Sequence, residues 1–185
     1  MNEGLIPNRY AKALIKAAAE KDCQSQLYGI MLTLSSSLNS NPALMKTVAN
    51  PFVESDKKIR LLSTAADIRE ESAAAKLYVD FLNLLVKNKR INFIQEIALN
   101  FQRIYRQENN IYLVRITTAG ELPQKETDKL IDLVQAQLPE GASIQLEKKV
   151  DPSLIGGFSI AIDNSLIDAS VKNQLKQLRS NLISQ

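Results

Sequence analysis

The residues whose types and spacing most suggest chemistry lie at positions 150–157, which read Val-Asp-Pro-Ser-Leu-Ile-Gly-Gly. Paired glycines permit backbone angles and close approaches that a side chain would forbid, and a phosphate-binding loop needs such freedom. The spacing, however, matches neither Gly-x-x-x-x-Gly-Lys nor a Gly-x-Gly-x-x-Gly that opens a helix. We therefore expect an architectural role, in which Pro152 turns the chain and Gly156 and Gly157 lead it into a further strand.

The residue types that carry most nucleophilic and zinc chemistry are missing or nearly so. The chain has no histidine, and Cys23 is its only cysteine. This excludes Ser-His-Asp and Cys-His sites and His- or Cys-rich zinc sites. A small Mg²⁺-dependent enzyme remains an alternative, although no pattern such as Asp-x-Asp-x-Asp gathers carboxylates. The sequence predicts a non-catalytic protein with no metal and no cofactor.

Length and composition indicate a globular protein rich in helices. The 185 residues suit one large domain or two small ones, and without Trp the core must come mainly from Leu, Ile, Val and Ala. No segment approaches the ~20 apolar residues that cross a bilayer, and residues 1–10 lack the apolar core of a signal peptide. We expect any association with a membrane to come through partners.

Residues 1–108 have helical apolar spacing and predict a six-helix bundle. Asn41 and Pro42 form a start signal, an Asn N-cap followed by Pro at the first helical position. Ser55 is the expected cap of the next helix. The six expected helices cover residues 9–22, 24–38, 42–49, 55–62, 72–87 and 94–105.

Residues 109–185 change period and predict a small α/β domain, which makes the fold class α+β in two domains. β-Branched and aromatic residues indicate a strand at 111–119, and apolar alternation indicates another at 143–150. A helix that begins at Pro123 is expected between them.

A hairpin is expected next, with Asp163, Asn164 and Ser165 as its turn. The chain then ends in a helix capped by Asp168 or Ser170.

The first and fifth helices have apolar faces that are wider than one core explains. The apolar arc of the helix over 9–22 spans roughly 240°, whereas a surface helix needs little more than 100°. The helix over 72–87 repeats this pattern. Either both helices are buried nearly all round within the bundle, or each offers a second apolar face to a partner. If those faces adjoin, they form a groove suited to an amphipathic helix.

A nucleic-acid-binding helical protein is the alternative suggested by charge. The net charge is +3, and Lys12, Lys16, Lys87, Lys89 and Arg90 could contact phosphates. The run at 87–90 also lies at an expected helix end, where cations complement the helix dipole. No stacking aromatic residues lie beside it, as a single-strand binder would require.

Several segments, in order, resemble the delta subunit family of bacterial and chloroplast F-type ATP synthases, which is related to the mitochondrial oligomycin-sensitivity-conferring protein. The segments at 150–157 and 167–178 resemble its C-terminal signature, the most specific match. Asp163-Asn164 departs from the Gly-Asp common in relatives. The other similar segments are 9–14 (Arg-Tyr-Ala-Lys-Ala-Leu), 50–53 (Asn-Pro-Phe-Val), 81–91 and 117–119 (Thr-Thr-Ala).

The resemblance implies a non-catalytic stator subunit in the peripheral stalk of the enzyme. Residues 1–108 would bind the N-terminal helix of an alpha subunit on the catalytic head, and residues 109–185 would join the b subunits. One copy per complex, at the cytoplasmic face of the inner (plasma) membrane, would resist rotor torque and so couple proton flow to ATP synthesis.

The family's binding groove lies between the first and fifth helices, the two that periodicity singles out. The residues expected to line it are Tyr10, Ala13, Leu14, Ala17, Leu77, Phe81 and Leu84. For the stalk contact the candidate is the last helix with Leu175 and Leu178, although these side chains could instead pack on the sheet.

Overall fold

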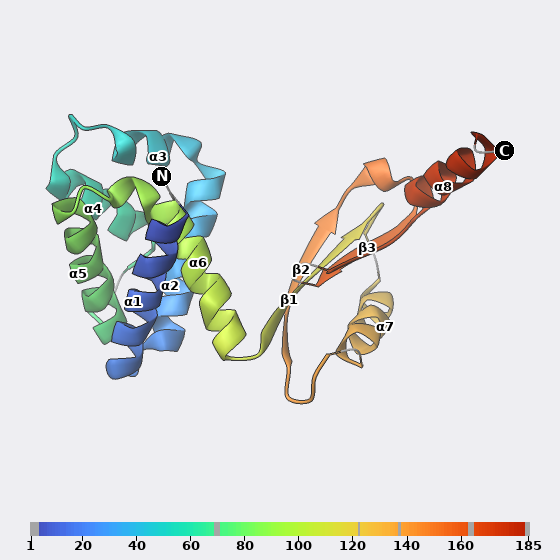
Figure 1. Cartoon of the computed structure of the whole chain (residues 1–185), viewed down its shortest axis with the longest axis horizontal. Helices are drawn as coiled ribbons and strands as arrows, with labels where there is room; N and C mark the ends of the chain where they lie inside the picture. The colour runs from blue at the N-terminus through green and yellow to red at the C-terminus, as the bar shows by residue number, and fades with distance from the viewer. Residues whose placement is uncertain (1–3, 69–70, 122, 137, 163–164, 184–185) are drawn as a thin grey trace. The chain divides into compact units, whose positions relative to one another are not determined.

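The chain divides into two compact units, Met1–Arg106 and Gln107–Gln185. The computed structural model describes residues 4–68, 71–121, 123–136, 138–162 and 165–183 (Figure 1). The first unit is helical and the second contains a four-stranded sheet with helices, so the fold class is α+β.

The helices of the first unit begin and end close to the residues that periodicity predicts. The first helix differs most, because it begins at Leu5, four positions before the expected Arg9, with Pro7 in its first turn where the missing N–H costs little. It ends at Glu20, and Asp22 has a φ of 49°. The helices are α1 (Leu5–Glu20), α2 (Gln24–Ser40), α3 (Pro42–Ala49), α4 (Ser55–Ala65), α5 (Ala73–Lys87) and α6 (Ile94–Glu108), with a 3₁₀ turn η1 (Ile91–Phe93) before α6.

Helix capping follows the sequence signals only in part. The Ser72 hydroxyl accepts a hydrogen bond from the Ala75 N–H at 3.0 Å and caps α5. Pro42 is the first residue of α3, as predicted, but the side chain of Asn41 makes no capping hydrogen bond. The prediction that Ser55 caps α4 is wrong. Ser55 is the first residue of the helix, and Glu54 holds the cap position.

The core of the helical unit takes buried side chains from all six helices. Tyr78 and Phe101 are fully buried in it. Gln102, also buried, donates to the Met31 carbonyl and to the Ser35 hydroxyl, both at 2.8 Å, and so joins α6 to α2. A buried amide with two partners avoids the cost of an unsatisfied polar group.

The second unit is built on a sheet in the order β2-β1-β3-β4. Strand β1 (Ile111–Thr118) pairs in parallel with β2 (Ser143–Val150), and the crossover that a parallel pair requires contains α7 (Gln124–Gln135). Strands β3 (Gly157–Ile162) and β4 (Ser165–Ser170) form the expected hairpin, with β3 antiparallel to β1. The predicted turn residues Asp163 and Asn164 lie outside the described residues.

One face of this sheet holds a small core. Val114, Ile116 and Ile160 are buried against Val134 of α7, since alternate residues of a strand share a face. On the opposite face, Arg115 contacts Glu147 at 2.8 Å across the β1–β2 pair. Strand β2 lies at the edge of the sheet. Residues 144–146 are partly buried, whereas residues 147–150 are exposed.

The segment at 150–157 connects the two strands that flank β1, as its turn and glycine residues predict. Its 3₁₀ turn η2 (Pro152–Leu154) is followed by Ile155 and Gly157, both with positive φ. A Cβ on Gly157 would overlap the carbonyl oxygen of Ala169 in β4, so this position requires glycine for conformation and for space. The segment is architectural.

The same segment positions α8 (Val171–Ile183), the last helix. The Gly156 carbonyl accepts the Val171 N–H at 3.0 Å. Of the two predicted caps, Ser170 is the capping residue, because its hydroxyl accepts the Asn173 N–H at 3.2 Å. Asp168 instead accepts the Ser170 N–H at 3.0 Å and orients the cap.

Gly157→Ala should destabilise the second unit by more than about 1 kcal/mol, because alanine at this φ is strained and its Cβ meets backbone. Hydrogen exchange of the β3 and β4 amides in the full chain measures the effect. Gly29→Ala in α2 is the matched control, since nothing lies within 4 Å of its Cβ position, and there alanine should stabilise the helix. Unchanged exchange in β3 and β4 of the Gly157→Ala protein would contradict this account.

Asp151 should titrate below the ordinary aspartate range. Hydrogen bonds from the side chain and the backbone N–H of Ser153 lower the pKa of its carboxyl, helped by the charges of Lys149 and Lys172. Because the folded pKa is depressed, the stability it contributes is present above the unfolded pKa and is lost as the pH falls through the folded value. NMR titration should show this pKa rising in Ser153→Ala; an unchanged value would argue against the hydroxyl contribution.

Candidate functional site

The start of α1 lies against the end of α5 in the helical unit (Figure 1). The side-chain amide of Asn88, just after α5, donates to the Tyr10 hydroxyl at 3.1 Å. The Tyr10 ring also meets the Phe81 ring edge to face, with 6.3 Å between their centroids. These contacts fix the two helices side by side in opposite directions.

A groove of about 810 Å³ runs between the two helices. Apolar side chains of both helices dominate its lining, and polar groups lie among them. The residues that line it are Ile6, Arg9, Tyr10, Ala13, Leu14, Ala17, Leu77, Asp80, Phe81, Leu84, Asn88 and Arg90.

The groove has a buried floor and more accessible walls. Leu14, Leu77 and Phe81 are each less than 10% exposed and also pack into the unit. Ala13 is exposed and Leu84 is 46% exposed, with its side chain available to a ligand. A concave apolar surface with small residues on one wall can receive the apolar face of a helix.

All seven residues that the sequence assigns to the groove line it together. Whether they bind a partner is not tested by this geometry and stays a prediction. Sequence reasoning missed Ile6 and the polar members Arg9, Asp80, Asn88 and Arg90. Arg9 and Asp80 are polar residues that border the wide apolar arcs of their helices, and Arg90 belongs to the basic run at 87–90.

Leu175 and Leu178 lie in the other unit, on α8. They are 52% and 59% exposed, so neither side chain is buried on the sheet and both leave apolar surface open to a partner. The helix lies against the end of β4 and against η2 through its first turns. From residue 174 to residue 180 every residue is exposed.

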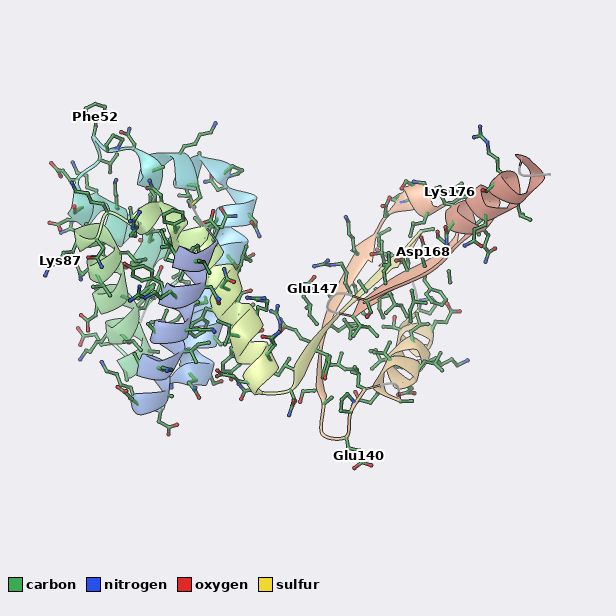
Figure 2. The ribbon with its side chains drawn as sticks, viewed as in Figure 1. Phe52, Lys87, Glu140, Glu147, Asp168 and Lys176 are labelled. Atoms are coloured by element: carbon green, nitrogen blue, oxygen red, sulfur yellow. The ribbon has the colours of Figure 1, made fainter. Side chains whose placement is uncertain are left out.

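Other large apolar side chains are also exposed outside the groove. Phe52, in the turn after α3, is 94% exposed at the outer edge of the helical unit (Figure 2). Its backbone N–H is held by the Asn50 side chain at 2.9 Å. Leu99 on α6 is 48% exposed. Scattered exposed apolar residues are normal for proteins, unlike a lined groove.

The titratable groups show no catalytic arrangement among the described residues. There, no three acidic or cysteine side chains come close enough to hold a metal ion. Burial raises the pKa of Tyr78 well above its usual range, and its hydroxyl donates to the Leu62 carbonyl at 3.2 Å, which is a structural contact. Within the described residues, no helix is long and apolar enough to span a membrane.

The sequence matches a family model over almost its whole length. Residues 6–182 match the family described as "ATP synthase delta (OSCP) subunit". An ATP synthase subunit delta from Parabacteroides distasonis is 35% identical, over 99% of this chain and 98% of the relative. A second, from Bacteroides thetaiotaomicron, is 35% identical over 99% of this chain and 96% of the relative. A third, from Prochlorococcus marinus, is 33% identical over 94% of this chain and 93% of the relative.

The fold is also similar to that of a solved chain. It belongs to a cryo-EM structure of the Toxoplasma gondii mitochondrial ATP synthase hexamer, with a TM-score of 0.72. The match covers 96% of this chain and 97% of the other at 22% identity, so it bears on the fold alone. The family is established by the match of residues 6–182 and by the relatives that are 33–35% identical over nearly the whole chain. The chain belongs to the ATP synthase delta (OSCP) subunit family, non-catalytic components of the peripheral stalk of F-type ATP synthase.

Proposed function

We propose that this protein joins the catalytic head of the ATP synthase to its stalk through two surfaces on its two units. The helical unit, working as one six-helix bundle, binds the N-terminal helix of an alpha subunit in the groove between α1 and α5. The second unit joins the b subunits through α8. One copy serves each complex, at the cytoplasmic face of the inner membrane, and reaches the membrane only through its partners.

The observation that carries this proposal is the groove, whose apolar lining is preformed. Burying an apolar side chain contributes on the order of 1.5–3 kcal/mol, so a few anchors from a bound helix give ample gross driving force. Association and ordering remove several kcal/mol or more of it. The family membership favours this role over nucleic-acid binding.

A stator must transmit force, which requires that each end be held separately. Torque on the head would otherwise turn the head with the rotor, and proton flow would not drive ATP synthesis. The groove and the exposed part of α8 belong to different units, so each can hold its own partner. This division supports a link between two parts of a complex.

Leu84→Asp should weaken binding of a peptide from the alpha subunit's N-terminus by at least about 1 kcal/mol, because it buries a charge against an apolar partner. Tyr10→Ala should weaken it similarly, since it removes an aromatic wall and its hydrogen bond to Asn88. Titration calorimetry with the full chain measures both.

The control is Leu99→Asp, because Leu99 is exposed to nearly the same degree as Leu84, at 48% against 46%, but lies on α6 outside the groove. It should bind the peptide as the unchanged protein does. If folded Leu84→Asp and Tyr10→Ala proteins also bind unchanged, the groove assignment is wrong.

In membranes, Leu84→Asp should uncouple the enzyme. With the head held less firmly, ATP hydrolysis should continue while ATP-driven proton pumping into inverted vesicles falls. The fluorescence quench of a pH-sensitive dye measures pumping, and Leu99→Asp vesicles serve as the comparison. Full pumping by Leu84→Asp vesicles at normal subunit content would count against the stator link through this groove.

A further inference from the structure

The exposed part of α8 carries two adjacent rows of different chemistry. Leu175 and Leu178 form an apolar row, and both are more than half exposed. Lys172, Lys176 and Arg179 follow each other at steps of four and three residues and form a basic row. At about 100° per residue the centres of the two rows lie roughly 100° apart, so they are neighbours on the helix surface.

The other border of the apolar row is uncharged. Gln174 and Gln177 lie there, both exposed. The helix contains no Asp or Glu at all. The surface is therefore one-sided, with cations along one border of the leucines and amides along the other.

The last two cations of the basic row, Lys176 and Arg179, differ from Lys172 in their surroundings. Lys172 lies beside Asp151 and Asp168, whose pKa values it helps to lower, and its ammonium is 3.5 Å from the Ser153 hydroxyl. Lys176 and Arg179 form no ion pair with any residue that the structure describes. Lys176 is labelled on α8 in Figure 2.

We propose that α8 docks an amphipathic helix of a partner protein that carries carboxylates along one border of its apolar row. The partner's apolar row meets Leu175 and Leu178, and its carboxylates pair with Lys176 and Arg179. This inference rests on the proposed stalk contact and adds the chemistry of the partner. Because only one border is charged, the pairing also fixes the direction and register in which the partner helix lies.

Two other occupants fit this surface less well. A second copy of α8 has no carboxylate to offer to the basic row. A helix that lies on a membrane usually has an aromatic or long apolar face and cations over its polar side, whereas α8 has no aromatic residue and its cations follow one border only. One-sided charge beside an apolar row is typical of paired helices.

The test measures binding of the soluble part of the b subunits to the full-length protein. Lys176→Glu/Arg179→Glu should lower the affinity about tenfold or more, because two pairs are replaced by like charges. Lys176→Gln/Arg179→Gln should lower it less and keeps the helix free of new charges. The loss should shrink at about 0.5 M salt, since exposed charges are screened.

The matched control is Lys46→Glu/Lys129→Glu, which makes the same change of net charge on exposed residues of α3 and α7. It should bind as the unchanged protein does. A b chain whose acidic border is changed to Lys should recover affinity for Lys176→Glu/Arg179→Glu, and such recovery would support direct pairing.

Three results would overturn the inference. If Lys176→Glu/Arg179→Glu binds the b chain normally, the charge pairing is wrong although the stalk contact stands. If the unchanged protein does not bind the b chain, the stalk contact itself falls, and the inference with it. If these variants lose binding only to vesicles of phosphatidylglycerol and phosphatidylethanolamine, α8 is a membrane surface instead.

Discussion

The packing of α1 against α5 is the constraint on which the candidate site depends. α5 buries seven of its residues on one broad face, wider than the stripe a typical surface helix needs. The Tyr10 ring against Phe81 and the Asn88 amide on the Tyr10 hydroxyl hold the start of α1 at the end of α5. With this contact in place, the apolar walls of both helices face a common groove. Without it, the same residues would be two separate apolar strips.

A second constraint governs the other unit. Gly157 meets the backbone of β4 so closely that no side chain fits, and the carbonyl of Gly156 holds the first N–H of α8. The hairpin and the last helix are thus fixed to one short segment. The first two residues of α8 make hydrogen bonds to Gly156 and η2, and residues 174 to 180, which carry leucines and cations, are all exposed. The local backbone strain at Ile155 is tolerated because the surrounding sheet and turn hold the chain there, whereas glycine at 157 adopts its positive φ without strain.

The two candidate surfaces differ physically. The groove is concave, mostly apolar and preformed, so it favours affinity through burial. The surface of α8 is convex and carries two cations that pair with no acidic residue among those described, so it favours orientation and rate of association. A link that must hold a head firmly and also engage a stalk in one register has use for both kinds of surface.

Much of this protein follows from local sequence. Helical and strand periods, the start of α3 at Pro42 and the turn at Pro152 act over a few residues, so they can be recognised in the sequence alone. Asn41 and Ser55 show the limit, because several residues compete for a cap and the geometry of the preceding loop decides.

Periodicity also predicted the wide faces of α1 and α5, but not whether they adjoin or which polar residues border them. Only the tertiary structure decided that Tyr10 reaches Phe81 and Asn88, and that Leu175 and Leu178 are left more than half exposed. Contacts between residues 78 positions apart depend on the packing free energy of the whole unit, which no local pattern contains.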